Sequence, residues 1–316
     1  MSLYSSITRR IEKVSRSARR PMDRWQGSML QNDFERFASV YERLTNERFT
    51  ARRRRPRTAD GADEELIATA AEQLRTSGVA VCRGWWDADT VAQAIDEMSV
   101  LETQWREVFA DREERGTIKD ERSLASYFYG NYRENQRLRV NFHRQHAALA
   151  PATVRRLLTD DRLAEITSRY FDTDTECGYV LAERLDPAPQ GDRWHVDRIV
   201  DQVKAMVLLT DVEVAHGPIR FKPDTHRNPP GMMQTYHRVF QRGVDEAYPS
   251  ETIVDALDGE VEFGTGRAGD CIIFDTLGVH SGTQCTADYR QVFVAAFCGQ
   301  TEKTRQLERW SRQSWI

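Results

Sequence analysis

Short apolar and alternating runs dominate roughly the last 140 residues of the chain, where Gly, Pro and Asp turns separate them. Each run has the length of a β-strand. The expected strands cover residues 178–185, 194–197, 203–210, 218–221, 261–263, 271–274 and 291–297. Short strands at this spacing, without helices between them, are typical of antiparallel sandwiches and barrels, so we expect a mainly β fold.

Helical spacing is more frequent in the preceding part of the chain. Residues 65–74 have it, and Asp87 or Asp89 can cap a helix that runs through Val91 and Leu101. Pro151 suits the first turn of a further helix. The remaining predictions are strands at 78–82 and 138–142 and a helix at 162–170. Residues 112–131 are charged and irregular, and they predict no element.

Composition narrows the class of protein. The 316 residues contain 30% charged and 40% hydrophobic side chains, as expected of a globular protein, and they suffice for one large domain with an appendage. No apolar run has the roughly 18 residues that a membrane span needs. The five cysteines are widely spaced and form no CxxC pair, which argues against a disulfide framework or a zinc cluster. We therefore expect a cytoplasmic protein with reduced thiols.

The charge is unevenly distributed along the chain. Residues 1–60 contain 15 Lys and Arg against 7 Asp and Glu, whereas the remainder contains 30 against 42. Leu3, Ile7, Ile11 and Val14 recur at helical spacing among basic residues, so we expect a basic helical arm and linker over 1–60 and a β domain over 61–316. We prefer an arm that packs on its own domain or self-associates. Contact with an anionic membrane surface stays an alternative, and nucleic acid is not expected.

His195 and Asp197 form the chemically most informative pair. Side chains two residues apart on a strand point to the same face, so both can hold one metal ion. His280 follows the expected strand 271–274, and Arg290 comes ten residues later. If these strands are neighbours, His280 completes a 2-His-1-carboxylate set of the kind that binds Fe(II) with open positions, and Arg290 is suited to grip a carboxylate deeper in the pocket.

These residues and several further stretches carry a family resemblance. The stretches are 203–211 (VKAMVLLTD), 217–221 (GPIRF), 223–226 (PDTH) and 74–81 (LRTSGVAV). Together with the order of His195, Asp197, His280 and Arg290, they resemble the phytanoyl-CoA dioxygenase-like (PhyH) group of Fe(II)- and 2-oxoglutarate-dependent oxygenases over about 62–300. The resemblance implies a double-stranded β-helix (jelly-roll, cupin-like) core with flanking helices.

The resemblance also implies roles for individual residues. His195, Asp197 and His280 are expected to ligate Fe(II), and Arg290 to bind the distal carboxylate of 2-oxoglutarate, with O2 as the other cosubstrate. The serine that the family often has two residues after the distal histidine is Gly282 here. Ser281, Thr283 and Lys204 are therefore the further candidates for contacts with 2-oxoglutarate.

The substrate is less defined than the cosubstrate. Arg184, Arg193 and Arg198 lie near the motif in sequence and favour an anionic small molecule, unless they pair with Glu183, Asp192 and Asp201. His226 lies in a turn like the family's and is a further candidate. We expect the pocket to involve the strand before the motif and the long segment 228–258, because loops on a rigid barrel often carry recognition.

Two functions follow from these expectations. The first is an oxygenase that uses Fe(II) and 2-oxoglutarate, releases succinate and CO2, and hydroxylates, desaturates or demethylates a small molecule. The carboxylate at Asp197 favours these reactions, because related halogenases have a small residue there. The alternative is a non-catalytic β-barrel module for binding or regulation, whose basic arm reaches nucleic acid or membrane.

Overall fold

The computed structural model describes residues 34–39, 41–43, 61–109, 116–119, 126–131, 137–197, 200–227, 231–242, 248–299 and 301. The chain divides into two units, Met1–Arg43 and Leu44–Ile316. In the first unit, residues 34–39 and 41–43 are helical. The rest of the expected arm and linker over 1–60 lies outside the described residues, so the division into an arm and an oxygenase domain stays a prediction.

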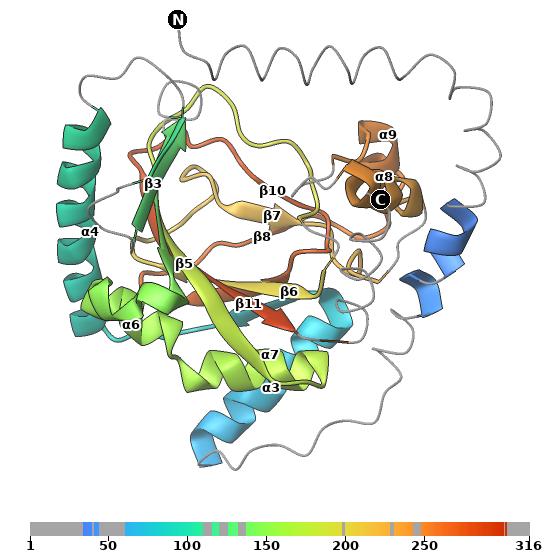
Figure 1. The fold of residues 1–316 in the computed structure, drawn as a ribbon, viewed down its shortest axis with the longest axis horizontal. Coiled ribbons are helices and arrows are strands. Elements are labelled where there is room, and N and C mark those ends of the chain that lie inside the picture. The colour runs from blue at the N-terminus through green and yellow to red at the C-terminus, as the bar shows by residue number, and fades with distance from the viewer. Residues whose placement is uncertain are drawn as a thin grey trace, which may run out of the picture. The chain divides into compact units, whose positions relative to one another are not determined.

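Two antiparallel sheets form the β part of the larger unit (Figure 1). The first has eight strands in the order β1-β9-β6-β11-β5-β4-β3-β2. These strands are β1 (Val79–Cys82), β2 (Gly116–Lys119), β3 (Ser126–Asn131), β4 (Arg137–His143), β5 (Thr175–Leu185), β6 (Gln202–Leu208), β9 (Cys271–Asp275) and β11 (Arg290–Gly299). The second sheet has the order β10-β7-β8. Its strands are β7 (Ile219–Phe221), β8 (Glu262–Phe263) and β10 (His280–Gly282).

The two sheets face each other across a shared core. Residue 195 extends the smaller sheet, because His195 forms an isolated antiparallel bridge with His280 of β10. The layer β5-β11-β6-β9 thus lies opposite a layer made of residue 195, β10, β7 and β8, which is the arrangement of a double-stranded β-helix. The core between them contains Met206, Leu208, Phe221, Phe274 and Val292, which come from both sheets. The expected fold class is confirmed.

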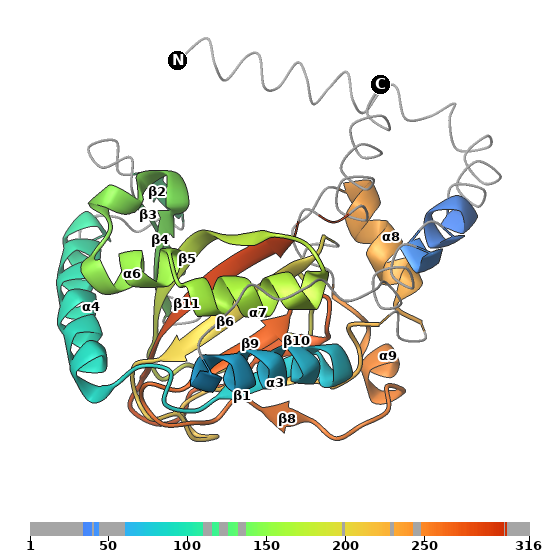
Figure 2. The ribbon, with the colours of Figure 1, turned by 90° about the horizontal axis from the view of Figure 1, so that it is seen from below.

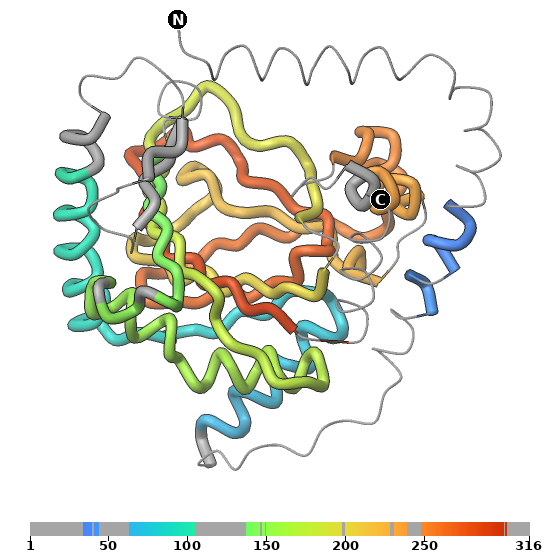
Figure 3. The backbone as a smooth tube through the Cα atoms, in the orientation of Figure 1, coloured from blue at the N-terminus to red at the C-terminus, as the bar shows by residue number. Residues whose placement is uncertain are grey.

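A second core lies on the other face of the large sheet. Successive residues of β6 alternate between the two cores: Ala205 and Val207 belong to this one, whereas Met206 and Leu208 face the small sheet. A strand buried on both faces has a continuous apolar sequence, which explains why the periodicity alone does not reveal a polar face. β11 lies between β5 and β6, although β5 and β11 are far apart in sequence (Figure 3).

Helices cover this second core, and Figure 2 shows α3 and α7 running along the sheet. They are α3 (Gly61–Ser77), α4 (Ala88–Phe109), α6 (Ala152–Leu158) and α7 (Asp161–Phe171), with a 3-10 turn, η1 (Arg144–Leu149), before α6. Asp87 accepts a hydrogen bond from the backbone N–H of Thr90 at 2.8 Å, as an N-cap does. None of the helices in the described ranges is long and apolar enough to cross a membrane.

Three expectations about individual elements need correction. Residues 112–131 contain a β-hairpin, in which β2 pairs with β3 and extends the large sheet. Residues 194–197 form no strand: only His195 and Val196 are bridge residues, and His195 bridges to His280. The segment 228–258 contains two helices that the sequence did not indicate, α8 (Met233–Arg242) and α9 (Glu251–Asp255). The other helices and strands expected after residue 60 are present, with ends that differ by a few residues.

Candidate metal centre

The backbone holds the two histidines of the candidate site opposite each other. The N–H of His195 donates to the carbonyl of His280 at 2.9 Å, and the N–H of His280 donates to the carbonyl of His195 at 2.9 Å. This doubly hydrogen-bonded pair brings the two ring centroids to 4.4 Å. The N–H of Asp197 donates to the carbonyl of Thr276 at 3.0 Å, which fixes the segment two residues further on. Short backbone bridges therefore position all three side chains.

Hydrogen bonds also fix the tautomer of both imidazoles. Nδ1 of His195 lies 2.8 Å from the carbonyl oxygen of Arg193, and Nδ1 of His280 lies 2.8 Å from that of Gly278. Because a carbonyl oxygen only accepts, each Nδ1 carries the hydrogen and donates it. Burial lowers the pKa of His280 to about 3, so its Nε2 is an unprotonated lone pair at neutral pH. Such an anchored ring is the usual form of a metal-bound histidine.

The carboxylate of Asp197 completes the set. Its Oδ1 lies 3.8 Å from Nε2 of His195 and 3.9 Å from Nε2 of His280. Its Oδ2 lies 2.6 Å from Nζ of Lys204 on β6. Burial alone would raise the pKa of Asp197, but the charge of Lys204 and then the two imidazoles lower it to about 2. The carboxylate is therefore ionised, with one oxygen directed to the histidines.

These three residues fit a divalent transition metal. One ligand atom from each lies within 4.8 Å of the others. Two neutral imidazole nitrogens and one carboxylate oxygen are the donor set of non-haem Fe(II) sites, which leave further coordination positions for other ligands. Lys204 is paired with the third ligand, and its expected contact with 2-oxoglutarate stays a prediction.

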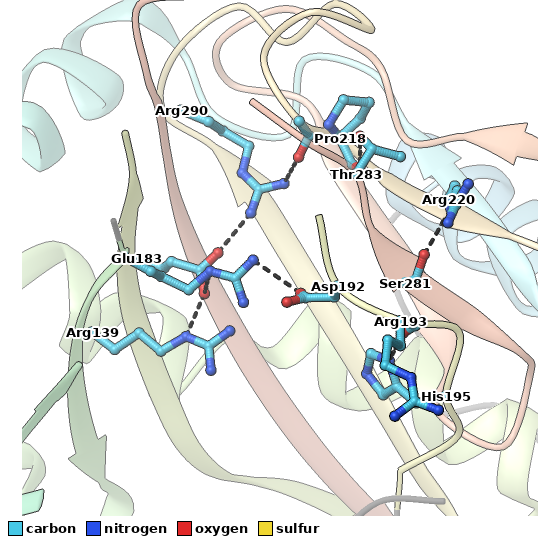
Figure 4. Close-up of polar contacts among 12 residues, drawn as sticks. Arg139, Glu183, Asp192, Arg193, His195, Pro218, Arg220, Ser281, Thr283 and Arg290 are labelled. Atoms are coloured by element: carbon cyan, nitrogen blue, oxygen red, sulfur yellow. Dashed lines mark hydrogen bonds and ion pairs between the residues drawn. The ribbon is translucent and has the colours of Figure 1, made fainter. Parts of the chain in front are cut away.

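Arg290 belongs to a buried charge cluster, and Figure 4 shows Arg290 at the opposite end of the view from His195. Its Nη2 donates to Oε1 of Glu183 at 2.6 Å, and its Nη1 donates to the carbonyl of Gly217. Nε of Arg139 donates to Oε2 of the same Glu183 at 2.6 Å, and Nε of Arg137 lies 3.7 Å from it. Burial alone would raise the pKa of Glu183, but Arg139, Arg137 and Arg290 lower it well below its ordinary value.

This cluster retains unused donors. Nε of Arg290 and Nε of Arg137 are both buried and have no hydrogen-bond partner. An unsatisfied buried N–H costs free energy, and two such groups on neighbouring guanidiniums favour an acceptor between the strands that is not part of this chain. A carboxylate is the acceptor that guanidinium groups bind best.

Comparison with known proteins agrees with this geometry. The family model described as phytanoyl-CoA dioxygenase (PhyH) matches residues 74–292, which is more than half of the chain. The chain belongs to the phytanoyl-CoA dioxygenase (PhyH) family. The resemblance that the sequence motifs carried is confirmed, and the family is one of Fe(II)- and 2-oxoglutarate-dependent oxygenases.

Solved structures show the same fold. The epimerase SnoN, in complex with Fe3+, alpha ketoglutarate and nogalamycin RO, is 18% identical, with a TM-score of 0.52 over 75% of this chain and 84% of that chain. EctD from S. alaskensis, with 2-oxoglutarate and 5-hydroxyectoine, is 17% identical, with a TM-score of 0.52 over 78% and 79%. AviO1 from Streptomyces viridochromogenes Tue57 is 17% identical, with a TM-score of 0.51 over 74% and 95%. A search of curated proteins found no match.

Residue 282, where the resemblance led us to expect a serine, is a glycine, and the structure explains it. A Cβ built on Gly282 would lie 2.7 Å from Oδ2 of Asp192 and 3.3 Å from Nη2 of Arg137. These two groups form an ion pair of 2.9 Å, so they occupy the space of a larger side chain. The hydroxyls of Ser281 and Thr283 both have partners within the chain, and their expected contacts with 2-oxoglutarate stay predictions. Ser281 accepts a hydrogen bond from Nε of Arg220 at 2.7 Å, and Thr283 donates to the carbonyl of Pro218 at 2.8 Å (Figure 4).

The expected substrate residues are dispersed. Arg184 pairs with Glu102 at 3.0 Å and with Asp186 at 2.7 Å, neither of which the sequence had suggested as its partner. His226 packs against the turn at Gly78, where a Cβ would lie 2.6 Å from Nδ1 of the histidine. Arg198 lies outside the described residues. Of the four candidates, the structure brings Arg193 to the metal ligands, through the hydrogen bond of its carbonyl with His195.

Sequence reasoning missed three residues at the site. The sequence suggested Glu183 only as a partner of Arg184, and it did not single out Arg137. Tyr248 lies in the segment 228–258 that was expected to contribute to the pocket, and its ring centroid is 6.0 Å from that of His195. No motif marks any of the three. The one signal was the position of Tyr248 in that segment.

Proposed function

We propose that this PhyH-family chain is a hydroxylase that uses Fe(II), 2-oxoglutarate and O2 to oxidise a small molecule. The observation that carries the proposal is the pair of anchored imidazoles. Both histidines donate Nδ1–H to a carbonyl two residues earlier in the chain, and both Nε2 atoms lie within 4 Å of the same carboxylate oxygen of Asp197. Metal-bound histidines almost always donate their other ring N–H in this way, so the arrangement supports a metal site.

Each part of the site has a role in this proposal. His195, His280 and Oδ1 of Asp197 hold the metal, and Lys204 keeps the carboxylate ionised and oriented through Oδ2. Arg290 binds the distal carboxylate of 2-oxoglutarate through donors that Glu183 leaves free. When bound, iron and the keto acid supply oxidative decarboxylation: 2-oxoglutarate, O2 and a substrate C–H give succinate, CO2 and a C–OH.

The nature of the neighbours supports a small-molecule substrate. SnoN was solved with nogalamycin RO and EctD with 5-hydroxyectoine, so this fold accepts small ligands of different chemistry. Because one of these neighbours is an epimerase, the fold does not select the reaction. We favour hydroxylation because Asp197 provides a carboxylate to the metal where a halogenating enzyme would need space for halide.

Succinate formation tests the proposal. Purified protein is loaded with Fe(II) under anaerobic conditions, given 2-oxoglutarate and then O2, and succinate is measured with and without candidate substrates. We expect slow succinate formation without substrate and loss of it in His195→Ala. A matched control is His216→Ala, since His216 is a loop histidine whose Nδ1 accepts from the N–H of Glu213 at 3.1 Å. Protein that binds neither Fe(II) nor 2-oxoglutarate, or a His195→Ala variant with unchanged turnover, would contradict the proposal.

A further inference from the structure

We propose that Arg193, stacked on Tyr248 beside the metal ligands, binds an anionic group of the substrate, a carboxylate or a phosphate. This inference rests on the proposed function, because it takes the metal centre as the place where the substrate is oxidised. It concerns the substrate and not 2-oxoglutarate, for which Arg290 is the proposed partner.

The first argument is position. The backbone carbonyl of Arg193 accepts the Nδ1 hydrogen of His195, so the start of the arginine side chain is fixed relative to a metal ligand. The guanidinium carbon lies 5.1 Å from the ring centroid of Tyr248, and that centroid lies 6.0 Å from the ring centroid of His195. The cation, the aromatic ring and the metal ligand thus adjoin one another. Figure 4 shows Arg193 beside His195 and apart from the buried arginines.

The second argument is charge. Asp192 precedes Arg193 in the chain, but its carboxylate pairs with Arg137 at 2.9 Å. Among the described residues, Arg193 has no carboxylate partner. Two other basic side chains that lie near the motif in sequence are neutralised: Arg184 by Glu102 and Asp186, and Lys204 by Asp197. The guanidinium beside the metal ligands therefore carries a charge that no described carboxylate balances.

The third argument is geometry. A guanidinium that lies over an aromatic ring keeps its N–H groups in its own plane, where a carboxylate or phosphate can accept two of them. Tyr248 also restricts the conformations of the arginine, so less side-chain entropy is lost when the anion binds. Both side chains are exposed, Tyr248 at 48%, so a ligand that enters from solvent can reach them. A small molecule with an anionic end held here presents its other end to the metal.

The test does not need the identity of the substrate in advance. A low-molecular-weight extract of the source cells is separated on an anion exchanger, and each desalted fraction is added to the Fe(II)-loaded protein with 2-oxoglutarate and O2. We expect the fractions that stimulate succinate formation to be retained and eluted by salt. Treatment with alkaline phosphatase then separates the two sources of charge, because it abolishes stimulation by a phosphate ester and leaves that by a carboxylate.

Variants connect the anion to the residue. In Arg193→Gln, the amount of active fraction needed for half-maximal stimulation should rise on the order of tenfold to a hundredfold, the value of a charge-assisted hydrogen bond. Arg193→Lys should need an amount between those of wild type and Arg193→Gln, because lysine keeps the charge but lacks the planar guanidinium. The control is Arg220→Gln. Arg220 also lies over a ring, with its guanidinium carbon 4.2 Å from the Trp194 centroid. However, Arg220 donates to Ser281, and the side chain of Ser281 faces away from the metal ligands. Arg220→Gln should respond as wild type.

The outcomes are distinct. The inference is overturned if the stimulating compound is in the unretained fraction, if no retained fraction stimulates, or if Arg193→Gln responds at wild-type concentrations. Fe(II) titration and thermal unfolding check that Arg193→Gln has an intact metal centre and fold. The proposed function itself has failed if wild-type protein lacks even the slow, substrate-independent formation of succinate and binds neither Fe(II) nor 2-oxoglutarate.

Discussion

Nζ of Lys204 lies 2.6 Å from Oδ2 of Asp197, while Oδ1 of the same carboxylate faces the two histidines. The two oxygens of Asp197 thus have separate neighbours, a cation of this chain on one and a prospective metal position on the other. In the metal-free protein, Lys204 is the counter-charge that lets a buried carboxylate stay ionised.

Lys204→Met should therefore destabilise the metal-free protein more than the metal-loaded protein. Breaking a buried ion pair leaves Asp197 uncompensated, so the free energy of unfolding without metal should fall by about 3–5 kcal/mol. A bound divalent metal supplies the missing charge and should recover part of this loss. Denaturant unfolding with and without Fe(II) under anaerobic conditions measures both values.

Lys222→Met is the matched control for Lys204→Met. The ammonium of Lys222 donates to the backbone carbonyls of Leu257 and Gly259, at 3.3 and 3.2 Å, and to no carboxylate among the described residues. Its replacement should cost the same with and without metal. If Lys204→Met loses equal stability in both states, the ammonium does not serve as the counter-charge of Asp197.

Arg290→Gln should weaken the binding of 2-oxoglutarate and leave Fe(II) binding intact. The substitution removes the charge that the proposal assigns to the distal carboxylate, so the KM for 2-oxoglutarate should rise about tenfold to a hundredfold. Glu183 keeps Arg139 as a partner in this variant, which limits the structural damage. Succinate formation at varied 2-oxoglutarate gives the KM. An unchanged KM would assign the carboxylate to another group.

Ser281→Ala and Thr283→Ala should have little effect on the KM for 2-oxoglutarate, in contrast to what the sequence suggested. Ser281 is bonded to Arg220, and Thr283 donates to Pro218, so neither hydroxyl is directed to the metal ligands. We expect KM to stay within about threefold of wild type, since substitutions away from a site rarely change free energies by more than about 0.5 kcal/mol. A tenfold rise in either variant would restore that residue as a contact.

The orientation of Ser281 could have been predicted from the sequence. Neighbouring residues of a strand face opposite sides, so the placement of His280 toward the metal already turned Ser281 away. Apolar runs also predicted β6, β9 and β11 well, because these strands are buried on both faces. The His195, Asp197 and His280 set was identified from its residue types and spacing, and the bridge between His195 and His280 brings its two histidines together.

The charge cluster could not be predicted in the same way. Glu183 and Arg290 meet because β5 and β11 pair in one particular register, with Gln291 opposite Arg184 and Val292 opposite Glu183. A shift of this register would give Glu183 other partners, and the sequence does not state the register. Tyr248 reaches His195 from a segment with two helices that the periodicity did not reveal.

The pH dependence of stability should report the state of Glu183. Its folded pKa is lowered, so its contribution is complete above the unfolded value of about 4.3 and is lost as the pH falls through the lower folded value. Glu183→Gln should destabilise by about 3–5 kcal/mol at pH 7, since it removes the carboxylate shared by buried arginines. The difference from wild type should shrink below pH 4. Denaturant unfolding between pH 3 and 7 tests this, with Glu262→Gln, at an exposed glutamate, as the control. If Glu183→Gln differs from wild type by the same free energy of unfolding at pH 3 and at pH 7, the prediction is contradicted.

The cysteines should differ sharply in reactivity. Burial raises the pKa of Cys82 to about 11 and that of Cys177 to about 12, and it also raises the pKa of Cys271 and Cys285. All five thiols are free, and Cys298 alone among them is not fully buried. Because the thiolate is the reactive form, a disulfide reagent at pH 8 should modify Cys298 in the native protein and the other four only after denaturation. Cys298→Ser should abolish the native reaction. Rapid modification of a second thiol in the native protein would contradict the prediction.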